Sequence, residues 1–125
     1  MPPKTQKKEV ITPITGEDLE AALNPENHKL IIVDTYLQHW GPCSVMEPNF
    51  RTVYFEIEEA EKRIAFHTIE FNEIPEEIRN GLESPASVKP KFLVFLEGEL
   101  KAEIEGADYT KIENQIKINL PGLDD

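Results

Sequence analysis

One short segment of the chain combines a thiol with turn residues that would present it to a substrate. It contains His39, Trp40, Gly41, Pro42 and Cys43, and it lies between a run of apolar residues and a helical pattern. The dipole of a helix lowers the pKa of a thiol at its N-terminus and so favours the nucleophilic thiolate. Cys43 is therefore a candidate for thiol chemistry, but a lone cysteine is more often a small buried apolar side chain, and we favour that packing role.

Other reactive side chains show no pattern that would suit a metal or a cofactor. Cys43 is the only cysteine among 125 residues, so it cannot form an intramolecular disulfide or join a cysteine-based metal cluster. The three histidines, His28, His39 and His67, are scattered along the chain without metal-ligand spacing. We therefore expect no metal site and no cofactor.

The charge balance narrows the classes of partner. The chain has 13 Lys and Arg against 24 Asp and Glu, a formal net charge of −11. Nucleic acids and anionic membranes are negative, so this balance argues against both and favours a protein partner. The longest apolar runs are far shorter than the roughly 18 residues of a membrane span, and residues 1–8 lack the apolar stretch of a secretory signal. We expect a reducing, cytoplasmic compartment.

The apolar periodicity predicts strands and helices in the order βαβαβαββα. The predicted strands are 9–14, 29–36, 64–71, 92–96 and 100–105, and the predicted helices are 15–23, 43–64, 75–82 and 109–120. Strands that are apolar throughout imply parallel pairing with helices on both faces, and a tight turn at Gly98 adds an antiparallel hairpin. We expect one domain over 9–122, a flexible arm over 1–8 and a short tail over 123–125.

The second predicted helix is long and contains a proline. Its apolar positions recur every three or four residues from Met46 to Ile64, which predicts one continuous amphipathic helix. Pro48 lacks a backbone donor, so the helix either starts near it or is kinked there. The glutamates on its polar side favour a solvated face over a catalytic or cation site; they are Glu56, Glu58, Glu59 and Glu61.

Taken together, these features resemble the thioredoxin family. Gly41, Pro42 and Cys43 match the end of its Trp-Cys-Gly-Pro-Cys redox motif. Further matches at the family's spacing are its buried acid, its helix-kinking proline, its cis-proline and its late glycines, at Asp34, Pro48, Pro90, Gly98 and Gly106-Ala107. The resemblance covers about residues 9–120 and implies a thioredoxin fold, a central mixed β-sheet flanked by helices on both faces.

The chain departs from the family motif at the residue that performs the first chemical step. Trp40 occupies the position of the attacking cysteine, and Cys43 occupies that of the resolving cysteine. An indole cannot attack a disulfide, so dithiol-disulfide exchange is not expected. Monothiol members of the superfamily keep the first cysteine, so this pattern is not theirs either. The resemblance therefore implies a protein that is not an enzyme.

Three site residues have alternative roles. Asp34 resembles the family's proton-handling acid, but without the attacking thiol we favour a retained, hydrogen-bonded acid. Trp40 either anchors a binding partner or folds back onto its loop, and these two stay open. The resemblance favours a cis peptide bond at Pro90 over an ordinary trans turn.

The resemblance also implies a shallow apolar groove that grips an extended peptide in this family. Here that groove would be lined by Trp40, Gly41, Pro42, Val88, Lys89, Pro90, Gly106 and Ala107. Because a large aromatic residue replaces the nucleophile, the groove is expected to bind a protein partner without reacting.

One subfamily resembles the chain most. The shared features are the turn at 97–100, the Glu-Gly-Ala at 105–107, the tail 112–122 and Lys89 ahead of Pro90. They resemble the thioredoxin-like light chains of axonemal outer-arm dynein and thioredoxin domains fused to nucleoside diphosphate kinase modules. This resemblance implies a redox-inactive docking subunit that binds a dynein heavy chain in the cilium or flagellum. The alternatives are a monothiol enzyme or redox sensor acting through Cys43, and a thioredoxin-like adaptor outside cilia.

Overall fold

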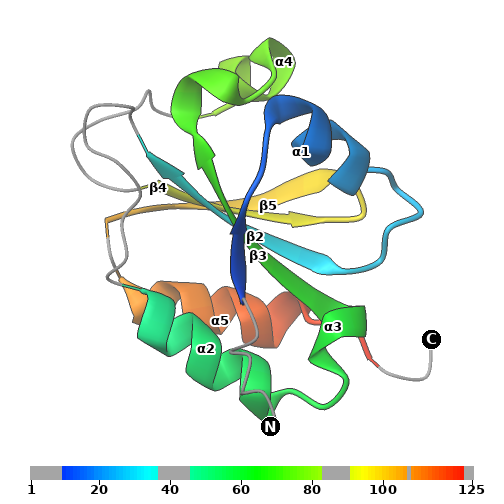
Figure 1. The fold of residues 1–125 in the computed structure, drawn as a ribbon, viewed down its shortest axis with the longest axis vertical. Helices are drawn as coiled ribbons and strands as arrows, with labels where there is room; N and C mark the ends of the chain where they lie inside the picture. The colour runs from blue at the N-terminus through cyan, green and yellow to red at the C-terminus, as the bar shows by residue number, and fades with distance from the viewer. Residues whose placement is uncertain (1–9, 37–45, 83–90, 107, 123–125) are drawn as a thin grey trace, which may run out of the picture.

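The structure is a computed structural model, and it describes residues 10–36, 46–82, 91–106 and 108–122. The predicted arm over 1–8 and the predicted tail over 123–125 lie outside the described residues. The described residues form a central five-stranded sheet with helices on both faces (Figure 1).

The sheet is mixed, as predicted. Its strands are β1 (Ile11–Pro13), β2 (Leu30–Tyr36), β3 (Ile64–Glu70), β4 (Lys91–Leu96) and β5 (Glu99–Glu105). Their order across the sheet is β1-β3-β2-β4-β5. β3 runs parallel to β1 and β2, whereas β4 runs antiparallel to β2 and to β5. The predicted parallel units and the predicted closing hairpin are therefore both confirmed.

Helices cover the sheet on two sides. α2 (Glu47–Glu56) and α5 (Tyr109–Asn119) lie on one face, and α1 (Gly16–Ala22) and α4 (Glu76–Asn80) lie on the other (Figure 1). A short helix, α3 (Ala60–Arg63), precedes β3, and a 3-10 turn, η1 (Phe71–Glu73), follows it. We refer below to the α2/α5 face and the α1/α4 face of the sheet.

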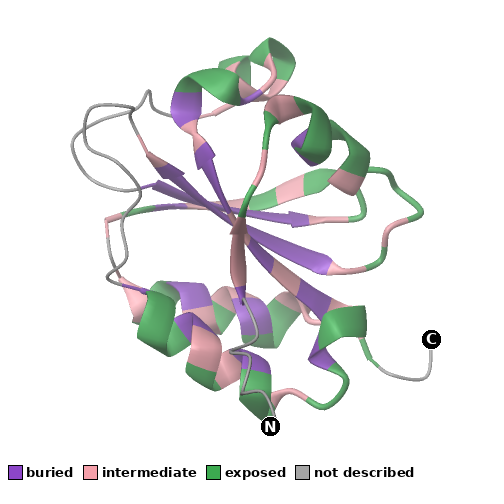
Figure 2. Ribbon diagram, in the orientation of Figure 1, coloured by how far each residue is buried: buried purple, intermediate pink, exposed green. Residues whose placement is uncertain are grey.

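Two apolar clusters fill the space between the sheet and its helices. The side chains of β2 alternate between them, since Leu30 and Ile32 pack on the α2/α5 face whereas Ile31 and Val33 pack on the α1/α4 face. All four are at most 2% exposed, and Figure 2 shows the strands as the most buried layer. The prediction of a strand buried on both faces is confirmed.

The predicted long helix is wrong in one respect: it is two helices. α2 ends at Glu56, Ile57 is extended, and Glu59 has a left-handed φ of 53° before α3 begins at Ala60. After α3, Ile64 begins β3 opposite Leu30 of β2. Ala60 and Ile64 are buried after the break, so the apolar spacing suits the core although the helix is interrupted.

Pro48 lies at the second position of α2. The first turn of a helix has no partner for its backbone donors, so a proline costs nothing there. Of the two roles that the sequence allowed, a helix that starts near Pro48 is the one observed.

The hairpin between β4 and β5 has a two-residue turn followed by a bulge. Glu97 and Gly98 both have positive φ, at 52° and 84°, which suits a tight turn. Next to the turn Phe95 pairs with Leu100, but beyond it Val94 pairs with Ala102, so Lys101 is an extra residue in β5. Because of this extra residue, the side chains of β5 that follow the bulge point to the opposite faces of the sheet from those that a regular strand would give them.

The prediction of a single apolar face for β5 is wrong because of the bulge. The sequence alternates Leu100, Ala102 and Ile104 with charged residues, which favours one shared apolar face. In the structure Leu100 packs on the α1/α4 face, whereas Ala102 and Ile104 pack on the α2/α5 face. The extra residue at Lys101 is the physical reason, since inserting one residue reverses the alternation.

A substitution at Gly98 tests the turn. A Cβ there would lie 2.7 Å from the carbonyl oxygen of Leu23, and the left-handed φ is strained for any side chain. Gly98→Ala is expected to lower the free energy of unfolding by about 2 kcal/mol, measured by urea denaturation. Gly81→Ala is the control, because its nearest neighbour would lie 3.6 Å away and its φ is −88°. Equal losses in both variants would contradict the prediction.

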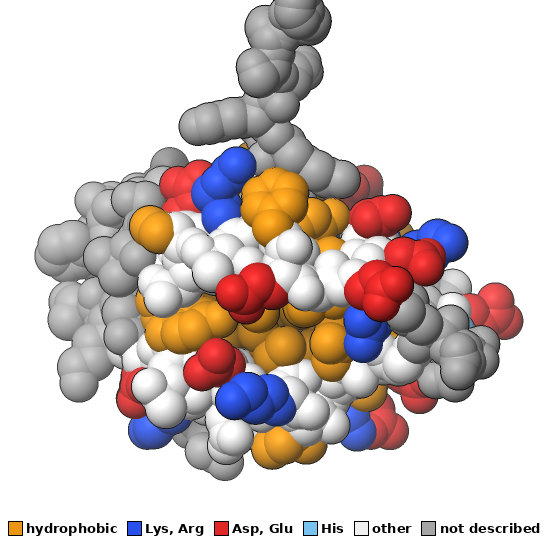
Figure 3. Space-filling view, turned by 90° about the horizontal axis from the view of Figure 1, so that it is seen from below, with side chains coloured by type: hydrophobic (Ala, Val, Ile, Leu, Met, Phe, Trp, Pro, Cys, Tyr) orange, Lys and Arg blue, Asp and Glu red, His pale blue; other side chains and the backbone are white. Residues whose placement is uncertain are grey.

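The outer surface of α2 and α5 is mixed in character. Figure 3 looks onto this face and shows apolar side chains between scattered acidic and basic ones. A shallow groove of about 330 Å³ runs between the helices, with Val53 of α2 and Tyr109 of α5 among its lining residues. Phe55 is 59% exposed on the same helix as Val53, and the guanidinium of Arg51 lies 5.6 Å from the centre of its ring. Within the described ranges, no helix is long and apolar enough to cross a membrane.

Candidate functional site

The segments that carry the predicted site leave the sheet at one end. β2 ends just before 37–45, β4 begins just after 83–90, and β5 ends just before the predicted glycine-alanine turn. Thr35 pairs with Lys91 across β2 and β4, and Lys91 pairs with Glu105 across β4 and β5. The three segments are therefore attached to neighbouring positions of adjacent strands, as the predicted site requires.

The structure describes two of the predicted site residues, Asp34 and Gly106. The other members of the redox motif and of the groove lie outside the described residues; they are Trp40, Gly41, Pro42, Cys43, Val88, Lys89, Pro90 and Ala107. Gly106 has a left-handed φ of 88°, and its carbonyl accepts the N–H of Asp108 at 2.9 Å. A Cβ on Gly106 would find no atom within 4 Å, so the surface is open at this predicted groove position.

Asp34 is a buried acid in the middle of the sheet. It is 1% exposed and pairs with Thr68 on β3 and Phe92 on β4. Its position in β2, two residues after Ile32, turns its side chain to the α2/α5 face, over an apolar cluster. Within the described part of the chain, its Oδ1 atom has no hydrogen-bond partner. The predicted burial is confirmed, whereas the hydrogen bond that we favoured is not observed at Oδ1.

Burial changes the acidity of Asp34. Removal of the carboxyl group from water disfavours its charged form and raises its pKa from 3.8 to about 7. A group with this pKa holds and releases a proton near neutral pH. Asp34 therefore has the proton affinity of a general acid or base, and it lies two residues before the end of β2, from which the chain continues toward Cys43.

A buried ion pair between Lys91 and Glu103 lies on the α1/α4 face of the sheet, opposite to Asp34, and the sequence analysis missed it. The Nζ of Lys91 lies 2.9 Å from Oε1 of Glu103, and their side chains are 5% and 11% exposed. Lys91 begins β4 directly before its apolar run, so a charge at the start of an apolar strand was the available signal. Thr35 joins this group, since its hydroxyl donates to the carbonyl oxygen of Lys91 at 2.8 Å.

Breaking this ion pair should destabilise the fold. Lys91→Met leaves the carboxylate of Glu103 in its buried place without the ammonium group, and we expect a loss of about 3 kcal/mol in the free energy of unfolding. Urea denaturation at neutral pH measures it. The exposed pair of Lys101 and Glu99 supplies the comparison, because Glu99→Gln should change stability by less than about 1 kcal/mol. A loss below that value for Lys91→Met would show that the buried pair is energetically unimportant.

The described histidines have local partners. Nδ1 of His67 lies 2.9 Å from the hydroxyl of Thr12, and burial lowers the pKa of His67. Nδ1 of His28 lies 2.9 Å from Oε2 of Glu97. Among the residues that the structure places, no three His, Cys, Asp or Glu side chains gather as metal ligands would. His39 lies outside the described residues.

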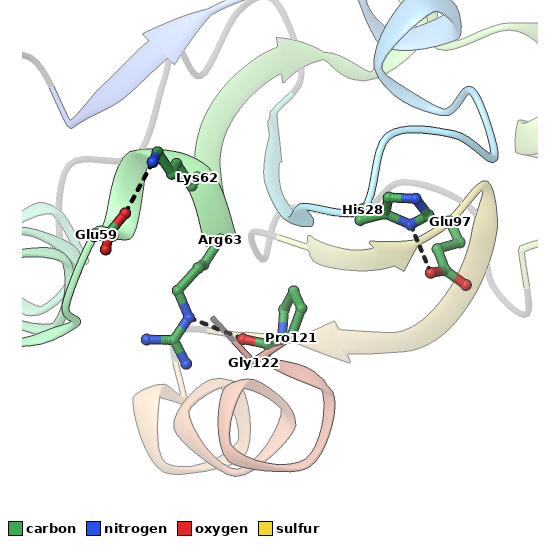
Figure 4. A pocket seen from close by; sticks show the side chains of 7 residues that line it. All are labelled: His28, Glu59, Lys62, Arg63, Glu97, Pro121 and Gly122. Carbon is green, nitrogen blue, oxygen red and sulfur yellow. Dashed lines mark hydrogen bonds and ion pairs between the residues drawn. The ribbon is translucent and has the colours of Figure 1, made fainter. Parts of the chain in front are cut away.

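A polar pocket of about 450 Å³ lies beside the turn between β4 and β5, at the end of β4 away from the candidate site (Figure 4). Its charged groups are largely satisfied within the pocket wall. Lys62 pairs with Glu59, His28 pairs with Glu97, and the Nε of Arg63 donates to the carbonyl of Pro121 at 2.8 Å. Among the residues that the structure describes, no predicted site residue lines this pocket.

The comparisons with known proteins agree with the fold. The family model described as Thioredoxin matches residues 10–118. Thioredoxin-2 of Pyricularia oryzae is 29% identical over 85% of this chain and 57% of its own length. The 16 kDa light chain of the flagellar outer-arm dynein of Chlamydomonas reinhardtii is 31% identical over 82% of this chain and 63% of its own length.

Solved structures show the same architecture. The crystal structure of reduced Schistosoma mansoni thioredoxin has a TM-score of 0.64 and 24% identity over 89% of this chain and 99% of that chain. The chain spans less than two thirds of the two curated relatives described above, so their full length is not represented here. The family match, which covers most of the described residues, is decisive. This chain belongs to the thioredoxin family.

Proposed function

We propose that this chain is a redox-inactive, thioredoxin-like light chain of ciliary outer-arm dynein. Its role would be structural: it would dock on a dynein heavy chain within the multi-subunit motor of the axoneme, using the groove that includes Trp40 and Gly106. No nucleic acid, membrane, metal or cofactor takes part in this proposal.

The similarity to the Chlamydomonas dynein light chain carries the proposal. Trp40 supports it, because the residue at the position of the attacking cysteine cannot form a mixed disulfide. A large aromatic side chain at a binding surface is instead a common anchor for a protein partner. The retained fold would thus serve binding without reaction.

Extraction of dynein from purified axonemes tests the proposal. The chain is expected to co-sediment with the outer-arm heavy chains on a sucrose gradient and to stay with them through ion-exchange chromatography. Sedimentation free of the heavy chains would reject the docking role. Co-purification with a different complex from a native cytoplasmic extract would identify a non-ciliary adaptor instead.

The alternative is thiol chemistry through Cys43, and one observation favours it. Asp34 is buried with a pKa of about 7, which is the proton affinity that thiol exchange at neutral pH would use. The wild-type chain is nevertheless expected to reduce insulin disulfides no faster than the reductant alone. Turnover that disappears in Cys43→Ser would establish the redox alternative and reject the inactive light chain.

A further inference from the structure

We propose that the groove between α2 and α5, called the helix groove below, binds an arginine or lysine side chain of a partner protein between Glu56 and Glu113. Apolar residues of the same basic segment would contact the outer surface of the two helices. The identity of the partner as a dynein heavy chain rests on the function proposed above, whereas the chemistry of the groove does not.

The helix groove has a volume of about 330 Å³, and both helices line it. α2 contributes Pro48 and Val53, and α5 contributes the aromatic ring of Tyr109. Asn49 and Thr52 add neutral polar groups on the α2 side. Val53 and Tyr109 also pack against the apolar cluster under the helices, which holds them in place. Figure 3 looks onto these helices and shows apolar side chains between them, so the groove is open to a partner.

Each helix adds one carboxylate to the groove. These are Glu56 of α2 and Glu113 of α5. Burial raises the pKa of Tyr109, and the negative charges of Glu113 and Glu56 raise it further, so both charges act on the same phenol. Neither carboxylate forms an ion pair with any residue that the structure describes. The single arginine of α2, Arg51, does not line the groove, and its guanidinium lies over the ring of Phe55 instead.

A basic side chain suits this combination of groups. Two like charges on one groove repel each other, and a cation placed between them removes that repulsion. The face of the Tyr109 ring attracts a cation, and a guanidinium has several N–H donors in a geometry that matches carboxylates. A metal ion would need more ligands than two carboxylates, and no three His, Cys, Asp or Glu side chains gather in the described ranges.

The apolar surface on the same helices indicates a protein partner rather than a small cation. Among the described residues, the large apolar side chains that are exposed are Phe55 and Ile118, at 59% and 66%. Phe55 belongs to α2 and Ile118 to α5, which are the two helices that line the groove. Exposed apolar side chains beside polar groups are typical of protein interaction sites. The net charge of −11 also attracts a basic segment from a distance.

The helix groove adjoins the predicted docking residues along the chain. It runs along α2 from Pro48, at the second position of the helix, to Glu56, its last residue. The end at Pro48 follows the segment 37–45, which carries Trp40. The α5 wall starts at Tyr109, three residues after Gly106. A partner that binds at Trp40 and Gly106 would therefore meet the helix groove next.

A peptide titration tests the groove without any dynein subunit. The probe is a blocked peptide of alanine, leucine and arginine, and the control peptide has citrulline, the neutral analogue of arginine, at each arginine position. In NMR spectra of the full chain, the arginine peptide is expected to shift the methyl signals of Val53 and the ring signals of Tyr109. The citrulline peptide should leave both unchanged. Shifts at other helices without shifts at Val53 and Tyr109 would overturn the proposal.

Removal of the two charges is the matching change in the chain. Glu56→Gln/Glu113→Gln keeps the side-chain shapes and is expected to abolish the shifts that the arginine peptide causes. Glu20→Gln/Glu26→Gln removes the same charge at exposed positions outside the groove and should respond like the wild type. Circular dichroism verifies that both variants are folded. An equal response of the two variants would show that the peptide senses only the net charge, and the proposal would fail.

The same spectra distinguish two other occupants of the groove. Residues 1–8 contain Lys4, Lys7 and Lys8, and the full chain with all three replaced by glutamine tests whether they supply the cation. Shifted Val53 and Tyr109 signals in that variant without peptide would assign the groove to this chain's own segment and overturn the proposal. Shifts that grow with protein concentration would assign the groove to a second copy and overturn it as well.

Binding to a recombinant dynein heavy-chain tail tests the identity of the partner. The Kd of Glu56→Gln/Glu113→Gln is expected to be about tenfold higher than that of the wild type, or 1.4 kcal/mol, with the Kd of the control variant unchanged. Added salt should weaken binding of the wild type more than binding of the groove variant. Equal affinities of the two variants would reject the groove as the heavy-chain contact and leave the light-chain function standing. If the wild type does not bind the tail, the proposed function fails, and the peptide titration still decides the groove.

Discussion

Replacing Asp34 with asparagine is expected to raise the free energy of unfolding by roughly 4 kcal/mol at pH 9 and to leave it almost unchanged at pH 3. Asparagine resembles the neutral acid in shape and cannot ionise. The gain at high pH arises because the wild-type carboxylate is then charged in a site that is 1% exposed.

The direction of the pH dependence follows from the raised pKa of Asp34, which is about 7 in the folded chain against an ordinary value of 3.8. Below pH 3.8 the group is protonated in both the folded and the unfolded chain, so it does not affect stability. Between pH 3.8 and 7 only the folded chain keeps the proton, and the stability of the wild type falls as the pH rises. Above pH 7 the full penalty applies.

Urea denaturation followed by circular dichroism from pH 3 to pH 9 measures this difference. Glu20→Gln changes the charge equally at an exposed site of α1 and serves as the control, with a small difference from the wild type at every pH. If Asp34→Asn differs from the wild type by the same amount across the whole range, Asp34 does not ionise as its burial requires.

Replacing Trp40 with cysteine is expected to create disulfide reductase activity. The substitution completes the Cys-Gly-Pro-Cys motif, so the introduced thiol can attack a disulfide and Cys43 can resolve the mixed disulfide. We expect insulin reduction at least about tenfold above the wild-type rate, which is about 1.4 kcal/mol of the barrier. The assay uses dithiothreitol as the reductant and follows insulin precipitation.

Two further variants show whether the activity depends on the new thiol or only on removal of the indole, and whether it needs Cys43. Trp40→Ser removes the indole without adding a thiol and should remain inactive. Trp40→Cys/Cys43→Ser keeps the new thiol without its resolving partner and should form a mixed disulfide but not turn over. An inactive Trp40→Cys that is folded would show that the chain has lost more of the redox machinery than its first cysteine.

Much of the fold follows from local patterns. The apolar run at 30–33 predicted a buried strand, and the helix predicted over 15–23 is α1, where the hydroxyl of Thr15 accepts the N–H of Asp18 at 3.2 Å. Gly98 predicted the hairpin turn, because the ability to adopt a left-handed φ is a property of glycine itself. These features depend on residues within one turn or one strand, so the sequence reveals them.

Features that depend on partners distant in the chain were not predictable in the same way. The break after Glu56 lies inside a continuous apolar periodicity, and the bulge at Lys101 appears only when β5 is aligned with β4. The periodicity of one segment has no information about either feature. Sequence reasoning therefore joined α2 to α3 and gave β5 a single apolar face.

The candidate site shows the same division. The sequence by itself determined its chemical inventory: one thiol at Cys43, an indole at Trp40 in place of the attacking cysteine, and an acid at Asp34. Only the tertiary structure decided that Asp34 is ionised with difficulty and that Lys91 and Glu103, twelve residues apart, form a buried ion pair. The physical reason is that the type of a side chain is a local property. Its exposure to water and its charged neighbours depend on which strands pack around it.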